Sequence, residues 1–198
     1  MFILASASPR RQELLKEILA DFRVQASQIE EVLNADLNSL AEQVTDLALQ
    51  KALAVANLQP PDVWVLGSDT MVCLGPEALG KPADEADAER MLHALSGQKH
   101  QVITGVALIK TQDAGPLCWH GHAVSDVYMR ETTVSERQAY IATGEPADKA
   151  GAYAIQGGAK DFITKIEGPY DNIVGLPLDI VRSLLQAAAY PFPAQSQT

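Results

Sequence analysis

The sequence predicts a fold that combines helices and strands, because segments with helical periodicity alternate along the chain with short apolar segments typical of strands. The 198 residues are 47% hydrophobic, which is sufficient to bury a core, and one domain is the default at this length. A division into two lobes around a cleft is compatible with both observations. We therefore expect an α/β or α+β protein with one domain at 1–190 and a flexible tail at 191–198.

The first elements follow this alternation. Residues 2–5, FILA, have the composition of a short buried strand. Ser8 and Pro9 then supply an N-cap and a proline at the first helical position. A short strand at 22–26 and the acidic loop SQIEEVLNAD lead to a long amphipathic helix at 39–58. The apolar stripe of the first helix consists of Leu14, Leu15, Ile18 and Leu19.

Three longer strand-like segments lie in the middle of the chain. The apolar, β-branched run at 63–75 is interrupted only by the residues GSDT. Segments 100–110 and 122–131 flank a polar loop that contains Pro116, which predicts an antiparallel hairpin near the centre of the sheet. The other expected helices are at 84–95, 134–142 and 176–189, and the last two enclose the glycine-rich segment ADKAGAYAIQGGAKDFI.

The overall charge limits the classes of partner. A formal net charge of −10 argues against sequence-independent binding of nucleic acid, which requires a basic surface. A small polyanionic ligand remains compatible, because 15 Lys and Arg residues can be concentrated in one cleft. Cys73 and Cys118 lie in apolar surroundings and are read as buried free thiols. Without a membrane span or a basic segment before the apolar N-terminus, we expect a soluble, cytoplasmic protein.

Two adjacent arginines stand at the start of the first helix, in ILASASPRRQELL. A helix N-terminus already carries the positive end of the helix dipole, so Arg10 and Arg11 are locally unfavourable there unless an anion is bound. Free backbone N–H groups and two guanidinium groups together suit a phosphate. The alternative is a capped helix with two solvated arginines.

Carboxylates in unusual surroundings are the next candidates. Asp69 interrupts an apolar strand, where a carboxylate is unfavourable unless it is paired, bound to a metal or open to a cleft. It is a candidate metal ligand or general base. The alternative is an aspartate at a strand end or bulge, capping a turn after Gly67. Glu30 and Glu31 could supply oxygen ligands to a metal, or could lie in an exposed acidic loop.

Lysines and a glutamine complete the candidates. Lys51, Lys81 and Lys149 could converge with the two arginines on a polyphosphate, although each alone is compatible with a solvated surface charge. Gln156 lies among glycines that permit close approach of the backbone to a ligand, and its amide can read the edge of a base. His100, at a strand start, is read as structural. Together these residues suggest hydrolysis of a nucleoside triphosphate.

Six segments then carry a resemblance to a known family: SASPRRQELL, GSDTMV, LGKPAD, LSGQKHQVITGV, GEPADKAGAYAIQGGA and NIVGLPL. Over residues 2–186 the sequence resembles the Maf-like nucleotide pyrophosphatases. The resemblance implies an α/β fold with an elongated mixed sheet, flanked by helices, and two lobes around a central cleft, as in inosine-triphosphate pyrophosphatases. It also implies cleavage between the α- and β-phosphates, a divalent cation (Mg²⁺ or Mn²⁺), a homodimer and a family link to septum formation.

The resemblance also implies roles for individual residues. Glu31 and Asp69 are implied metal ligands, with Glu31 rather than Glu30 at the acidic position. Asp69 would accept the proton of the attacking water or would hold the metal, and the sequence leaves both roles open. The cations and the metal would neutralise charge that develops on the phosphates. The implied catalytic set is Ser8, Arg11, Glu31, Lys51, Asp69 and Lys81.

Three positions concern substrate specificity. Arg10, Thr70 and Gln156 match the family branch that acts on dTTP and UTP, whereas the 7-methyl-GTP branch has a tryptophan before the arginines and a glutamate at the glutamine position. A neutral glutamine can pair with a pyrimidine edge. Ser68 departs from the alanine more usual in the dTTP/UTP branch, a small change of volume. We expect a dTTP/UTP pyrophosphatase that could also remove modified pyrimidine nucleotides. The alternatives are a 7-methyl-GTP pyrophosphatase and a nucleotide-sensing regulator of cell division.

Overall fold

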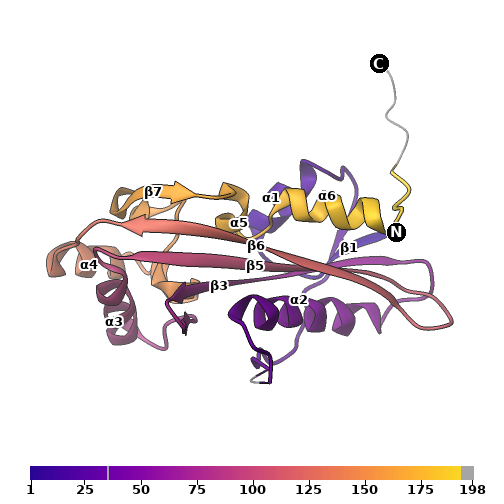
Figure 1. Cartoon of the computed structure of the whole chain (residues 1–198), viewed down its shortest axis with the longest axis horizontal. Coiled ribbons are helices and arrows are strands. Elements are labelled where there is room, and N and C mark those ends of the chain that lie inside the picture. Colours follow the sequence, from indigo (N-terminus) through magenta and orange to yellow (C-terminus); the bar gives the residue numbers. More distant parts are fainter. Residues whose placement is uncertain (35, 193–198) are drawn as a thin grey trace, which may run out of the picture.

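The computed structural model describes residues 1–34 and 36–192, and it shows an elongated, mixed sheet of seven strands flanked by helices (Figure 1). Six strands follow the order β2-β1-β3-β5-β6-β7, and β4 pairs with the far part of β3. β1 is parallel to β2 and β3, and the other pairings are antiparallel. The predicted fold class is thereby confirmed. The strands are β1 (Phe2–Leu4), β2 (Arg23–Val24), β3 (Trp64–Leu74), β4 (Glu77–Leu79), β5 (Lys99–Lys110), β6 (Leu117–Met129) and β7 (Ile163–Glu167).

Helices cover both faces of the sheet. One long helix, α2, packs on β3 and β5, while α1 and α6 lie on the opposite face (Figure 1). Two more, α3 and α4, pack together at the end of the sheet remote from α6. The helices are α1 (Pro9–Lys16), α2 (Leu40–Ala56), α3 (Glu85–Leu95), α4 (Val134–Ile141), α5 (Tyr170–Val174) and α6 (Leu178–Ala187), with 3₁₀ turns η1 (Glu145–Asp148), η2 (Ala150–Ala152) and η3 (Gly158–Phe162).

The two helices that carry candidate site residues begin at strong local signals. Ser8 is the N-cap of α1 and its hydroxyl accepts the N–H of Arg11, with Pro9 at the first helical position. Ser39 and Glu42 form a reciprocal capping box at the start of α2. The sequence therefore fixes where both helices start, as predicted.

Two glycines allow α2 to lie directly on the sheet. A Cβ atom added at Gly105 of β5 would lie 2.6 Å from both the Cα of Thr45 and the carbonyl oxygen of Val44. A Cβ at Gly67 of β3 would lie 2.8 Å from the Cβ of Ala52. Backbone therefore packs on backbone here, and this close contact sets the position of Lys51, one residue before Ala52.

One edge of β3 is open in its middle. β1 pairs with Trp64–Leu66 and β4 pairs with Val72–Leu74. Among the described residues, 67–71 of β3 therefore have a strand partner only on the β5 side. Since successive side chains of a strand point to opposite faces, this open edge presents side chains to both faces of the sheet.

The apolar core is divided between two halves of the elongated sheet. One cluster includes Val72, Leu92 and Phe162 and lies beneath α3 and α4. A second includes Leu66 and Leu185 and lies beneath α1 and α6. The long strands β3, β5 and β6 run through both halves, so each half is built on the same hydrogen-bonded sheet.

Several predicted boundaries were wrong. The second hairpin strand begins at Leu117 rather than 122, whereas the segment predicted at 63–75 forms a single strand, β3, as expected. α1 ends at Lys16, so Ile18 and Leu19 pack from the following turn. Elements β4, β7 and α5 were not predicted. Cys73 is buried as expected, but Cys118 is exposed, because it lies near the end of the hairpin where the neighbouring Leu117 is exposed too.

The predicted C-terminal tail and the predicted domain boundaries are not tested by the structure. Of the predicted tail, residues 193–198 lie outside the described residues. The assignment of residues 1–190 to a single domain stays a prediction. Within the described residues, no helix is both long and apolar enough to cross a membrane.

His100 is a buried histidine, as expected for a structural role. Its Nε2 lies 2.7 Å from the hydroxyl of Tyr153, and burial lowers its pKa to about 4, against a smaller opposing effect of Asp126. Because the unfolded chain binds this proton more readily, stability is expected to fall as the pH decreases from 6.5 to about 4. At about 1.4 kcal/mol per pKa unit, the loss between pH 7 and pH 4 approaches about 3 kcal/mol.

Urea unfolding of the wild type and of His100→Gln over this pH range measures the effect. The variant is expected to lack this part of the pH dependence, since its amide does not titrate. Parallel pH profiles for the two proteins would contradict the prediction.

Candidate active site

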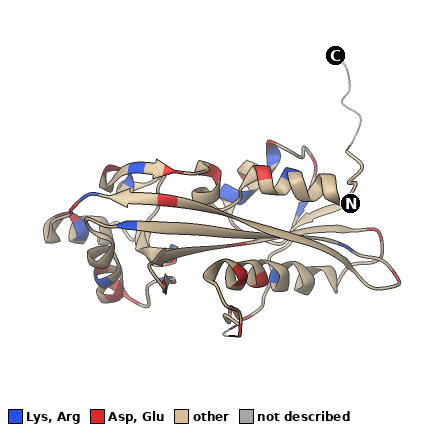
Figure 2. Cartoon of the chain, viewed as in Figure 1, with Lys and Arg blue, Asp and Glu red and all other residues tan. Residues whose placement is uncertain are grey.

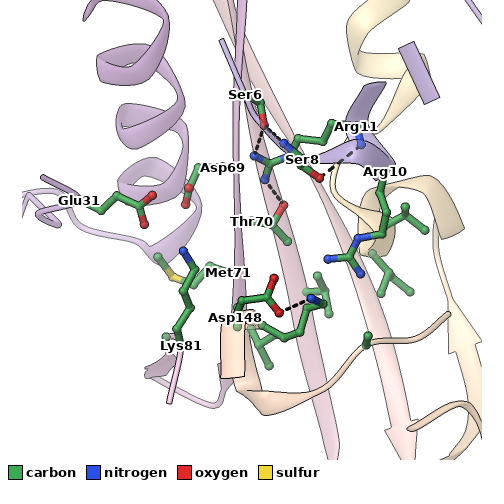
Figure 3. A pocket seen from close by; sticks show the side chains of 18 of the residues that line it. Ser6, Ser8, Arg10, Arg11, Glu31, Asp69, Thr70, Met71, Lys81 and Asp148 are labelled. Atoms are coloured by element: carbon green, nitrogen blue, oxygen red, sulfur yellow. Dashed lines mark hydrogen bonds and ion pairs between the residues drawn. The ribbon is translucent and has the colours of Figure 1, made fainter. Parts of the chain in front are cut away.

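A cavity of about 1120 Å³ lies at the open edge of β3, and Figure 3 shows side chains that line it. It is lined by the N-terminus of α1, the loop around Glu31, α2, β3, the segment after β4 and the glycine-rich segment 145–157. Every residue of the implied catalytic and specificity sets lines this cavity, whereas Glu30 does not, and the roles of these residues stay predictions. These residues are Ser8, Arg10, Arg11, Glu31, Lys51, Asp69, Thr70, Lys81 and Gln156.

Adjacent residues of β3 serve opposite faces of the sheet. The Asp69 side chain points to the α2 face, where it contacts Lys51. The side chain of Thr70 points to the α1 face, where it contacts Arg11. Figure 3 shows Glu31 and Asp69 on one side of the strand and the two arginines on the other. The open edge lets both groups reach the same cavity, and Asp69 lies in mid-strand rather than at a strand end or bulge.

Arg11 is held by three uncharged partners. Its Nε donates to the carbonyl oxygen of Gly175 at 2.8 Å, Nη2 donates to Thr70 Oγ1 at 3.0 Å and Nη1 donates to Ser6 Oγ at 3.3 Å. Among the described residues, no carboxylate lies within 4 Å of its guanidinium. Burial lowers the pKa of Arg11, although the charges of Asp69 and Glu31 act in the opposite direction. A positioned cation without a direct counterion is suited to an incoming anion.

Lys51 lies between the two candidate carboxylates. Its Nζ is 2.5 Å from Asp69 Oδ1 and 2.6 Å from Glu31 Oε1. Asp69 and Lys51 are nearly buried, whereas the Glu31 side chain is 48% exposed. Burial alone would raise the pKa of Glu31, but the hydrogen bond and charge of Lys51, with Lys81 and Arg11, lower it overall. Glu31 is therefore ionised at neutral pH.

Two further cations face the cavity. Within the described part of the chain, neither Arg10 nor Lys81 has a carboxylate within salt-bridge distance. In Figure 3, Lys81 extends toward Glu31 and Arg10 extends into the cavity from the opposite side. Elsewhere on the chain, basic and acidic positions are interspersed, and the view in Figure 2 shows no uniformly basic face. Three cations without a salt-bridge partner among the described residues, Arg10, Arg11 and Lys81, therefore line one cavity.

The donor set suits a hard divalent cation shared with a phosphate. Glu31 and Asp69 place two carboxylates around one ammonium group, which shows that they converge on a common point. No group of three or more His, Cys, Asp or Glu side chains that could hold a metal occurs in the described residues. Mg²⁺ is commonly bound by one or two carboxylates together with substrate phosphates rather than by a complete protein cage. The two residues therefore fit such an ion.

Gln156 lies at the exposed tip of a segment fixed on both sides. On one side, the backbone N–H of Ala154 donates to the hydroxyl of Tyr140 at 3.1 Å. On the other, the N–H of Gly158 donates to a carboxylate oxygen of Glu145 at 2.9 Å. A Cβ on Gly157 would collide with that same carboxylate. Among described residues the Gln156 side chain has no hydrogen-bond partner, so its amide is available to a ligand.

Some residues around the cavity were not predicted. Ser6 and Glu145 line it, and Thr104 lies behind Thr70. Glu145 carries a weak local signal, since it follows the turn TG and precedes a proline. Thr104 has none, because its contacts are with Thr70 and Asn172, which are distant in the sequence. Ser6 contacts Ser8 and Arg11, which are its neighbours in the sequence.

Other candidates lie where a different role is evident. Lys149 lines the cavity but pairs with Asp148, and His100 does not line it. The hydroxyl of Ser68 donates to the carbonyl of Gly175, which also accepts from Arg11, so the serine adds a hydrogen bond as well as volume.

The chain is similar to known proteins over most of its length. The family model described as Maf-like protein matches residues 1–188. A dTTP/UTP pyrophosphatase from Symbiobacterium thermophilum is 48% identical, over 96% of this chain and 94% of that protein. Another, from Geobacter sulfurreducens, is 47% identical, over 94% of this chain and 96% of that protein. A solved HAM1 protein from Coxiella burnetii aligns at a TM-score of 0.47 with 20% identity, over 65% of this chain and 72% of that one.

Proposed function

The chain belongs to the Maf-like protein family, and from this premise we propose that it hydrolyses dTTP and UTP to the nucleoside monophosphate and pyrophosphate. The observation that carries the proposal is the composition of one cavity. Cations without a direct counterion stand near two convergent carboxylates, and the Gln156 amide, which has free hydrogen-bonding groups, lines the same cavity. The first set suits a polyphosphate and the second suits a nucleobase.

In the proposed reaction, Asp69 accepts the proton of the water that attacks the α-phosphate. Lys51 holds its Oδ1, which leaves the second carboxylate oxygen for the water. The guanidinium of Arg11, fixed at the N-terminus of α1, binds a phosphate group, and Lys81 neutralises charge on the departing pyrophosphate. A divalent cation held by Glu31, and by Asp69 if its role is that of a ligand, would supply further neutralisation of phosphate charge. Ser8 supplies the N-cap that keeps Arg11 in place.

Nucleobase selection is proposed for the part of the lining formed by the glycine-rich segment 145–157. The amide of Gln156 offers a donor and an acceptor, which can pair with the edge of uracil or thymine. In Figure 3, Arg10 extends toward Asp148, which belongs to the glycine-rich segment 145–157 that also carries Gln156. Replacing Gln156 by alanine is expected to reduce the preference for UTP over CTP by about tenfold, as a lost bidentate contact is worth about 1–3 kcal/mol. The ratio of kcat/KM for the two nucleotides measures this preference.

Pyrophosphate release from dTTP, UTP, CTP, GTP and 7-methyl-GTP with Mg²⁺ or Mn²⁺ tests the function as a whole. Preferred turnover of dTTP and UTP is the expected result. Preferred turnover of 7-methyl-GTP would contradict the proposed specificity. Nucleotide binding without any turnover would favour a sensor instead of an enzyme. The homodimer and the cytoplasmic location stay predictions.

A further inference from the structure

We propose that Thr104 is a positioning residue for Arg11 and that it acts through the hydroxyl of Thr70. The inference rests on the proposed function, in which Arg11 binds a phosphate of the substrate. Thr104 lies on β5 directly opposite Thr70 on β3, and it is 0% exposed. It does not line the cavity, so any effect on the reaction must pass through its neighbours.

The hydrogen bonds around Thr104 fix the direction of each hydroxyl. Thr104 Oγ1 donates to the backbone carbonyl of Asn172 at 2.8 Å, and this uses its one hydrogen. The 3.0 Å contact between the two threonine hydroxyls must therefore have Thr70 as donor and Thr104 as acceptor. With its own hydrogen committed to Thr104, the oxygen of Thr70 presents a lone pair to Arg11 Nη2 at 3.0 Å. Each group therefore donates to the next in the order Arg11, Thr70, Thr104 and the carbonyl of Asn172, and we call this chain of hydrogen bonds the relay.

This order determines what remains of Arg11 for a ligand. A guanidinium has five N–H donors, one on Nε and two on each terminal nitrogen. The carbonyl of Gly175, Thr70 and Ser6 each take one, from Nε, Nη2 and Nη1 respectively. One N–H is left on each terminal nitrogen, and both can donate to a phosphate.

The packing around Arg11 holds its guanidinium group in one orientation. A Cβ at Gly175 would lie 3.2 Å from both Arg11 Nε and Thr70 Oγ1, so the guanidinium lies against the residue that ends α5. Asn172, the last acceptor of the relay, belongs to the same short helix. Two sets of hydrogen bonds therefore hold the Arg11 guanidinium against α5. One runs directly to the carbonyl of Gly175, and the other runs through Thr70 and Thr104 to Asn172.

The test compares Thr104→Val with Thr104→Ser and with the matched control Thr111→Val. Thr111 is also buried and its hydroxyl also donates to a backbone carbonyl, that of Pro60, but it is remote from the cavity. We expect Thr104→Val to lower kcat/KM for UTP by about tenfold and to weaken inhibition by pyrophosphate by about the same factor, as expected for misplacing one charge-assisted hydrogen bond. The serine variant restores both values, and the control leaves both unchanged.

The preference for one nucleobase over another distinguishes the proposed role of Thr104 from that of Gln156. Because the relay acts on phosphate binding, the ratio of kcat/KM for UTP and CTP stays unchanged in Thr104→Val. The proposal is overturned if pyrophosphate inhibition keeps its wild-type constant, or if the serine variant is as impaired as the valine variant. A changed UTP to CTP ratio would overturn it as well.

A second variant and a binding measurement distinguish loss of the relay from a general loss of folding or activity. Thr104→Val leaves the carbonyl of Asn172 without its donor, so Thr70→Val serves as a second variant that keeps that bond. It must reproduce the loss of pyrophosphate inhibition, and the double variant must show little further loss. Calorimetric binding of pyrophosphate to each protein needs no turnover. A wild type that binds pyrophosphate but hydrolyses nothing would therefore refute the proposed function alone.

Discussion

Replacing Asp69 by asparagine is expected to lower the rate of pyrophosphate release from UTP by about 10²- to 10⁴-fold, the usual contribution of a general base. Asparagine has nearly the same shape, and its carbonyl oxygen can still accept from Lys51. It cannot take a proton from water at neutral pH. The steady-state kcat with saturating Mg²⁺ measures the loss, and a variant with the wild-type rate would remove Asp69 from the mechanism.

A matched control and a binding measurement sharpen this experiment. Asp126 of β6 forms an ion pair with Lys99 at 2.7 Å on the same sheet but does not line the cavity, so Asp126→Asn makes the same chemical change elsewhere. It should leave kcat unchanged. Titration of Mn²⁺ into Asp69→Asn separates the two roles of the carboxylate. Retained affinity supports proton acceptance, whereas lost affinity would assign Asp69 to the metal.

Replacing Gly105 by alanine is expected to lower the free energy of unfolding by about 3 kcal/mol, at the upper end of the usual effect of overpacking. The added Cβ would lie 2.6 Å from the Cα of Thr45 and from the carbonyl of Val44, and neither is the end of a flexible side chain. Either α2 moves away from the sheet or β5 distorts. Urea unfolding monitored by circular dichroism gives the free energy.

The control for this variant is Gly80→Ala, since a Cβ at Gly80 would meet nothing within 4 Å. Its unfolding midpoint should remain close to that of the wild type. Equal stabilities of Gly105→Ala and Gly80→Ala would show that α2 is free to shift. Because Lys51 lies on α2, a shifted helix in Gly105→Ala should also reduce activity in the fraction that remains folded.

Local signals account for most of the fold that could be predicted. Ser8 with Pro9 and the Ser39–Glu42 capping box fix the helix starts through neighbours in sequence. β7 was missed because its residues ITKIE are largely exposed and show no clear alternation. The start of β6 was missed because Leu117 and the residues after it are exposed, and pairing with β5 alone makes them a strand.

The site could be predicted as a set of residues but not as an arrangement. Asp69 was conspicuous because a carboxylate in an apolar strand needs a partner, and Lys51 is that partner. The sequence could not show that Thr70 contacts Arg11 rather than standing free for a base. It also gave no indication of Thr104, whose importance arises only from the pairing of β3 with β5.

The open edge of β3 restricts which changes of length the chain tolerates. Insertion or deletion of one residue between Leu66 and Asp69 would turn every following side chain of the strand to the other face. The carboxylate would then point toward Arg11, and the threonine hydroxyl would point toward Lys51. A change of length in this segment therefore exchanges the two faces, whereas a substitution at Gly67 acts locally, by bringing a Cβ against Ala52 of α2. The turn between β5 and β6, at the tip of the hairpin, carries no such restriction.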